Sequence, residues 1–176
     1  MPKVFGDFEI ADFWEPSDYA NECYVDDIPS QADIARVEAE LGYRLPKSYV
    51  ELMSHQNGGI PRKRRHRTAT RTSWSSDHIA IEGISAIGHR KRYSLCGGLG
   101  QQLWLEEWGY PSIGVYFADC PSAGHDMLCL DYRECGANGE PQVVHIDQEW
   151  DYQITFVAPN FEAFIRGLEG DEAFPV

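Results

Sequence analysis

The fold of this chain is decided by residues 113–157, IGVYFADCPSAGHDMLCLDYRECGANGEPQVVHIDQEWDYQITFV. Apolar and β-branched residues gather there in short runs separated by turn-forming residues, a pattern typical of successive β-strands. The runs predict strands over residues 113–118, 127–132, 143–146 and 152–157. Because the connections are short, we expect the strands to pair in chain order as an antiparallel meander.

Helical patterns lie on both sides of this region. Apolar periodicity and suitable terminal residues predict helices from Ser30 to Gly42, from Pro46 to Asn57, over residues 103–108, and from Asn160 onward. Ser30 and Asp33 are spaced as a capping box. The sequence therefore predicts an α+β fold, with a central, mainly antiparallel sheet of about four to six strands flanked by helices that pack on one side of it.

The chain has 176 residues without an internal repeat or a long linker. We therefore expect a single domain over residues 1–176, large enough to bury roughly 70% of its unfolded surface. Two segments lack periodicity. Residues 1–29 are predicted to be irregular, with aromatic side chains that cover the domain, and residues 61–77 are predicted to form a basic loop.

The net charge is −13, and it is unevenly distributed. Residues 61–92 carry 9 basic and 2 acidic side chains, whereas the rest of the chain carries 6 basic and 26 acidic ones. Such a molecule repels nucleic acid and anionic membranes and attracts basic partners. We expect no nucleic-acid or membrane binding, and we expect the run Arg62–Arg67 to pair with the domain's own carboxylates.

The cysteine pattern and the hydropathy indicate the cytoplasm. The cysteines number five, an odd count without a CxxC motif, so a disulfide framework is not expected. The N-terminal sequence has no basic start followed by an apolar run, and no apolar stretch reaches 18 residues. We therefore expect neither a signal peptide nor a membrane span.

One turn carries residues that suggest chemistry. Asp119, Cys120, His125 and Asp126 offer metal-ligand or catalytic groups, but they lack the paired spacing of zinc sites. Cysteine–histidine nucleophile pairs could form from Cys120 with His125, or from Cys96 with His89, if the fold brings them together. We interpret the segment as a turn between strands and expect no catalytic residues, no metal and no cofactor, so the chain is predicted not to be an enzyme.

Six short motifs follow one another over about residues 30–170. They are Leu45-Pro46 with Tyr49, Asn57-Gly58-Gly59, Ile113-Gly114-Val115-Tyr116, Leu130-Asp131-Tyr132-Arg133, Gly139-Glu140-Pro141-Gln142-Val143-Val144, and Phe161 with Phe164-Ile165 and Leu168. In this order they resemble the SUKH superfamily, which is named after the yeast Smi/Knr regulators of cell-wall synthesis. The basic run from Arg62 to Arg67 departs from the family, where a less charged linker is expected.

The resemblance implies a central, mainly antiparallel sheet and a protein-binding function. Bacterial members are typically immunity proteins that bind and block polymorphic secreted toxins, often nucleases, and the eukaryotic branch supplies regulatory interaction modules. We therefore expect a bacterial immunity protein whose partner is a toxin domain, or alternatively a regulatory scaffold with a housekeeping partner. The chain is expected to be a monomer or a weak homodimer.

Two acidic stretches are candidates for contact with a basic toxin, because an acidic surface speeds association with a basic partner. The predicted partner-binding residues are Asp26, Asp27, Glu149, Trp150, Asp151 and Tyr152.

Overall fold

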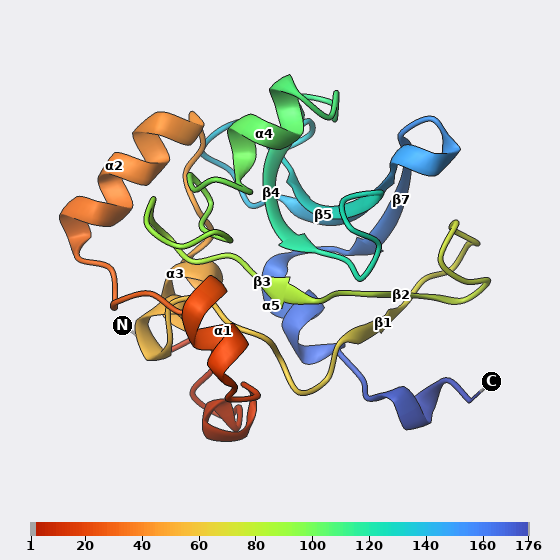
Figure 1. Ribbon diagram of the computed structural model, residues 1–176, viewed down its shortest axis with the longest axis horizontal. Coiled ribbons are helices and arrows are strands. Elements are labelled where there is room, and N and C mark those ends of the chain that lie inside the picture. The colour runs from red at the N-terminus through yellow and green to blue at the C-terminus, as the bar shows by residue number, and fades with distance from the viewer. Residues whose placement is uncertain (1–2, 176) are drawn as a thin grey trace.

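Residues 3–175, which the computed structural model describes, contain a five-stranded antiparallel sheet whose strands lie in chain order (Figure 1). The strands are β3 (Gly83–Ile84), β4 (Gly114–Asp119), β5 (Asp126–Asp131), β6 (Gln142–Asp147) and β7 (Gln153–Ala158). The α+β class and the predicted meander are therefore confirmed. Strand β3 was not predicted, because a strand of two residues is too short to show an alternating pattern.

Both faces of the sheet are covered. Successive side chains point to opposite faces, so Val115 and Leu128 join the larger apolar core with helices α2 (Gln31–Leu41), α3 (Lys47–His55) and α5 (Phe161–Arg166). Tyr116 and Met127 face the other side, where Trp104 of α4 (Gln101–Glu106) covers them. The expectation that the helices pack on one side is wrong, because these strands are apolar on both faces and both faces must be buried.

The helices are short, and their ends follow local chemistry. Ser30 Oγ accepts the Asp33 N–H at 3.0 Å while the Asp33 carboxylate accepts the Ser30 N–H at 2.9 Å, which confirms the capping box. Gly42 ends α2 in the left-handed region, at φ +82°. Across residues 3–175, no helix has the length and apolarity needed to cross a membrane.

The two edges of the sheet differ. At the first edge, β3 exchanges backbone hydrogen bonds with Gly59, and the side-chain amide of Gln101 bonds to the backbone of Gly114 and Tyr116 in β4, at 2.7 and 2.9 Å. These bonds hold the first residue of α4 against the edge of the sheet. The helix therefore begins at Gln101, two residues before the predicted start at residue 103. At the second edge, no strand among the described residues pairs with the outer side of β7. The sheet therefore has one closed edge and one open edge.

The N-terminal segment covers the larger core, as the sequence predicted, but it is not wholly irregular. It contains the short helices η1 (Ile10–Asp12) and α1 (Asp18–Cys23). The aromatic side chains of Phe5, Phe13 and Trp14 are buried in the larger core. Residues 1 and 2 of this segment, and residue 176 at the other end of the predicted domain, lie outside the described residues.

The basic segment is not only a loop. Residues Arg65–Arg67 form strand β1, which pairs with β2 (His78–Ala80) as an antiparallel hairpin. The expected pairing with the domain's own carboxylates is confirmed for three residues of the run, Arg64, Arg65 and Arg67. Arg64 contacts Glu15. The guanidinium group of Arg65 lies 2.8 Å from the Asp171 carboxylate, and that of Arg67 lies 3.2 Å from the Glu169 carboxylate.

The side chain of Asn57 joins three chain segments between α3 and the sheet. Its amide nitrogen donates to the carbonyl oxygens of Asp27 and Ile87 at 2.8 and 3.0 Å, and its amide oxygen accepts the Ile87 N–H at 2.8 Å. The next residue, Gly58, has φ +85°, and a Cβ atom there would lie 2.6 Å from the Tyr24 carbonyl oxygen. The Asn57-Gly58-Gly59 motif thus follows the end of α3 and holds the surrounding segments together.

We expect Gly58→Ala to destabilise the protein by about 3 kcal/mol or more, because the new methyl group meets backbone atoms that cannot move aside. Gly42→Ala is the matched control: its φ is similar, and nothing lies within 4 Å of the added Cβ. This control is expected to cost about 1 kcal/mol. Urea unfolding of both variants measures the difference, and equal losses would contradict the close approach at Gly58.

Candidate functional site

The first predicted acidic stretch lies in the connection between α1 and α2. The Asp27 side chain is 87% exposed, whereas that of Asp26 is only 7% exposed. Arg90 pairs with both, at 3.5 Å from Asp26 and 3.2 Å from Asp27. Only Asp27 therefore offers a carboxylate to a partner here, and Arg90 already neutralises part of its charge.

The second stretch forms η2 (Gln148–Trp150) and the turn into β7. Trp150 is 39% exposed, and Asp151 is exposed beside it. The Glu149 carboxylate lies 2.7 Å from His125 Nδ1. Tyr152 has a structural role, since its ring packs edge-on against Tyr110 and its hydroxyl donates to a backbone carbonyl. The turn thus presents one aromatic and two acidic side chains to solvent.

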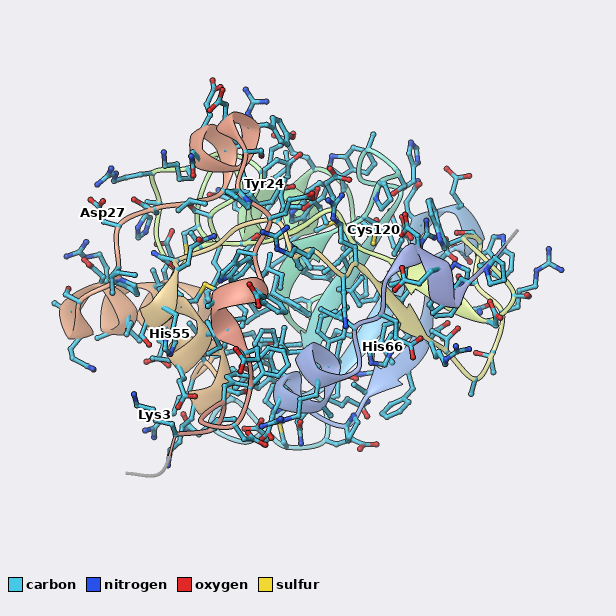
Figure 2. All side chains as sticks on the ribbon, turned by 90° about the horizontal axis from the view of Figure 1, so that it is seen from below. Lys3, Tyr24, Asp27, His55, His66 and Cys120 are labelled. Carbon is cyan, nitrogen blue, oxygen red and sulfur yellow. The ribbon has the colours of Figure 1, made fainter. Side chains whose placement is uncertain are left out.

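The two stretches lie on different parts of the molecule. Figure 1 places the α1–α2 connection on the left and the turn before β7 at the upper right. Figure 2 likewise shows Asp27 at one side and Cys120, which begins the turn carrying His125, in the other half. The six predicted residues therefore do not form one continuous surface.

Exposed aromatic side chains mark the open edge of the sheet. Phe156 on β7 is 52% exposed, and Trp150 precedes the same strand. Ser73 donates its backbone N–H and hydroxyl to Asp147 at the end of β6, so the hairpin loop that carries the half-exposed Trp74 reaches this end of the sheet. We define the β7 edge surface by these aromatic and acidic residues: Trp74, Glu149, Trp150, Asp151 and Phe156.

Sequence reasoning identified Trp150 but missed Phe156 and Trp74. A signal for Phe156 was present: the segment Ile154-Thr155-Phe156-Val157 is apolar at positions that point to both faces of the sheet. In the structure Val157 is buried in the larger core, while Phe156 extends beyond the side chains that cover the opposite face. An exposed phenylalanine on an unpaired edge strand is a feature that soluble proteins normally avoid, so it points to an interaction surface.

The structure brings together only some of the predicted residues of the turn from Asp119 to Asp126. His125 points away, to Glu149 and Gln148, and does not join Cys120. Instead, His145 of β6 approaches Cys120 and Asp126, with His145 Nε2 2.7 Å from Asp126 Oδ2. All three side chains are buried, and burial raises the pKa of the Cys120 thiol well above its usual range. This cluster is closed to substrates and holds its cysteine as an unreactive thiol.

The second cysteine–histidine pair is brought together. Cys96 and His89 lie with Glu40 in one group at the surface, with their nitrogen, oxygen and sulfur ligand atoms within 4.8 Å of one another. Burial, and secondarily the Glu40 carboxylate, raise the pKa of the Cys96 thiol to about 12. The thiol is therefore protonated at neutral pH, which does not suit a nucleophile.

Asp119, the remaining member of the predicted group, has a structural partner. The Tyr24 hydroxyl donates to both of its carboxylate oxygens, at 2.8 and 3.0 Å, and so ties the N-terminal segment to β4. Burial raises the pKa of the Asp119 carboxyl to about 7. A carboxyl with a raised pKa in the folded state favours folding at low pH, and this contribution is lost as the pH rises towards 7.

We therefore expect Asp119→Asn, which keeps an oxygen acceptor for Tyr24, to gain stability relative to the natural chain between pH 4 and pH 7. The relative gain is on the order of 2–4 kcal/mol. Urea unfolding at about pH 4.5, near the lower end of this range, and at about pH 8, above its upper end, measures it. The matched control, Asp27→Asn, removes an exposed carboxyl, and a gain for Asp119→Asn that does not change with pH would contradict the assignment.

Comparison with known proteins supports the resemblance seen in the sequence. No curated protein matches the chain. Comparison with protein families matches residues 28–167 to the SMI1 / KNR4 family (SUKH-1). The matched residues run from the start of α2 through the sheet to the end of α5, so they include the Asn57 junction and the β7 edge surface. The chain belongs to the SMI1 / KNR4 family (SUKH-1).

Proposed function

We propose that this chain is a bacterial immunity protein that binds a cognate toxin domain and blocks it through the β7 edge surface. Family membership supports a protein-interaction module. The observation that carries the choice of surface is the exposure of Trp150 and Phe156 beside an edge strand that no other strand covers among residues 3–175. The protein acts by occlusion and needs no cofactor.

The composition of the surface suits a protein partner. Aromatic side chains supply most of the binding energy at many interfaces when a partner removes them from water. The outer backbone groups of β7 offer further hydrogen bonds to an extended segment of the partner. Glu149 and Asp151 surround Trp150, as charged residues commonly surround an apolar centre. The surface therefore combines an apolar centre, an open strand and an acidic rim.

The net charge favours a basic toxin, such as a nuclease. At −13, the chain attracts a positively charged partner over distance, which raises the association rate at low salt. The basic run does not oppose this attraction strongly, because Arg64, Arg65 and Arg67 are paired with carboxylates of the same molecule. Unpaired thiols at the five cysteines fit a cytoplasmic site of action.

We expect Phe156→Ala and Trp150→Ala each to weaken toxin binding by roughly 30-fold, equivalent to about 2 kcal/mol. Ile28→Ala is the matched control, because Ile28 is 53% exposed and Phe156 is 52% exposed, yet Ile28 lies in the α1–α2 connection, away from the β7 edge surface. Titration calorimetry with the toxin domain encoded beside the gene measures the affinities. Unchanged affinity in both aromatic variants would place the interface elsewhere.

Co-expression tests the proposed function itself. A host that produces the neighbouring toxin should survive when this chain is present, and the two proteins should elute together in gel filtration. The alternative function is a regulatory scaffold with a housekeeping partner. The regulatory role of the eukaryotic branch of the family supports this alternative. Continued killing by the toxin, without a complex, would reject the immunity function, and recovery of an endogenous housekeeping protein through the β7 edge surface would support the scaffold.

A further inference from the structure

Three side chains with metal-binding atoms meet at the surface, away from the β7 edge surface. Glu40 lies in the last turn of α2, and His89 and Cys96 belong to the connection between β3 and α4. Their ligand atoms all lie within 4.8 Å of one another, and His89 Nε2 contacts the Glu40 carboxylate. Glu40 and His89 are 52% and 39% exposed, and Cys96 is half-buried.

The backbone holds these side chains in place. The Cys96 N–H donates to the carbonyl oxygen of Gly88 at 3.1 Å, and the Leu95 N–H donates to Ala86 at 2.8 Å. These backbone bonds close residues 88–96 into a loop. The backbone itself therefore keeps His89 and Cys96 close together. Glu40 sits on a capped helix, and the next residue, Leu41, is buried in the larger core. Ligands fixed on bonded backbone need little reorganisation to bind a metal.

We propose that Glu40, His89 and Cys96 bind a zinc ion, with the fourth position open to water. Nitrogen, oxygen and sulfur donors together match the ligand preferences of Zn²⁺, a borderline-soft cation. Zn²⁺ displaces the proton of the Cys96 thiol into solvent when it binds, and the resulting thiolate, with a carboxylate and a neutral imidazole, balances its two positive charges. Because the side chains are partly exposed, the ion can enter and solvent can bond to the other ring nitrogen of His89.

The buried group of Cys120, Asp126 and His145 contains the same donor types but is a poorer site. Its members are at most 2% exposed, which leaves no entry path in the folded state. The second ring nitrogen of His145, Nδ1, has no hydrogen-bond partner among the described residues, whereas ligating histidines almost always have one. The exposed group is therefore the better metal site, and the buried group serves as a control in the metal-binding experiment.

Zinc at this position would link the end of α2 to the loop between β3 and α4. These segments are 49 residues apart in sequence. A ligand that binds only the folded state stabilises it in proportion to the logarithm of its concentration above Kd. The melting temperature should therefore rise with added Zn²⁺ in the natural chain.

Cobalt provides a direct test, because Co²⁺ substitutes for Zn²⁺ and a thiolate ligand gives it a charge-transfer band in the near ultraviolet. Metal-free protein without a histidine tag is titrated with Co²⁺, then with Zn²⁺. We expect one Co²⁺ per chain with a thiolate band that Zn²⁺ abolishes. The band should disappear in Cys96→Ser, and His89→Gln and Glu40→Gln should weaken Co²⁺ binding about tenfold or more.

Two cysteine variants are controls that should keep the band: Cys135→Ser, at an exposed cysteine, and Cys120→Ser, in the buried group. Circular dichroism of the metal-free variants checks that each is folded, and the exposed His89→Gln variant provides the test if Cys96→Ser does not fold. Absence of a thiolate band in the natural chain would overturn the proposal. So would a band that survives Cys96→Ser, or one that Cys120→Ser removes. The result does not depend on toxin binding.

Discussion

The side-chain amide of Asn57 is the interaction on which the rest of the structure depends. It is 1% exposed, and it bonds to backbone groups of two segments that follow α1 and β3. If one of these bonds is lost, a buried polar group is left without a partner, and the folded state loses about 1–3 kcal/mol of stability for each such group. Because Gly58 then permits backbone to approach backbone closely, the helical layer meets the sheet at a fixed distance.

The two edges of the sheet differ in whether their backbone groups have partners. Gly59, two residues after Asn57, pairs with β3, and Gln101 of α4 completes the bonding of β4, so both strands at this edge have partners. Nothing comparable covers β7 among residues 3–175. A rigid core with one open, aromatic edge suits a binding module, because the partner meets an ordered surface and little conformational entropy is lost.

Two groups of similar donor atoms show how burial changes the chemistry of the same residue types. Cys120, Asp126 and His145 are closed within the core, where the thiol stays protonated and the aspartate bonds to the histidine. Glu40 and His89 are open to solvent, and Cys96 lies between solvent and core. The donor types of the two groups are nearly the same, so the groups differ mainly in whether a metal ion can reach them.

The sequence by itself determined strands β4 to β7, their order as a meander and the ends of α2, because alternation and capping are local properties of neighbouring residues. It also supported the family through the order of motifs such as Asn57-Gly58-Gly59. Only the tertiary structure decided that α4 covers the second face, that His145 rather than His125 joins Cys120, and that Phe156 is exposed. These facts depend on contacts between residues far apart in the chain, which a local pattern cannot specify.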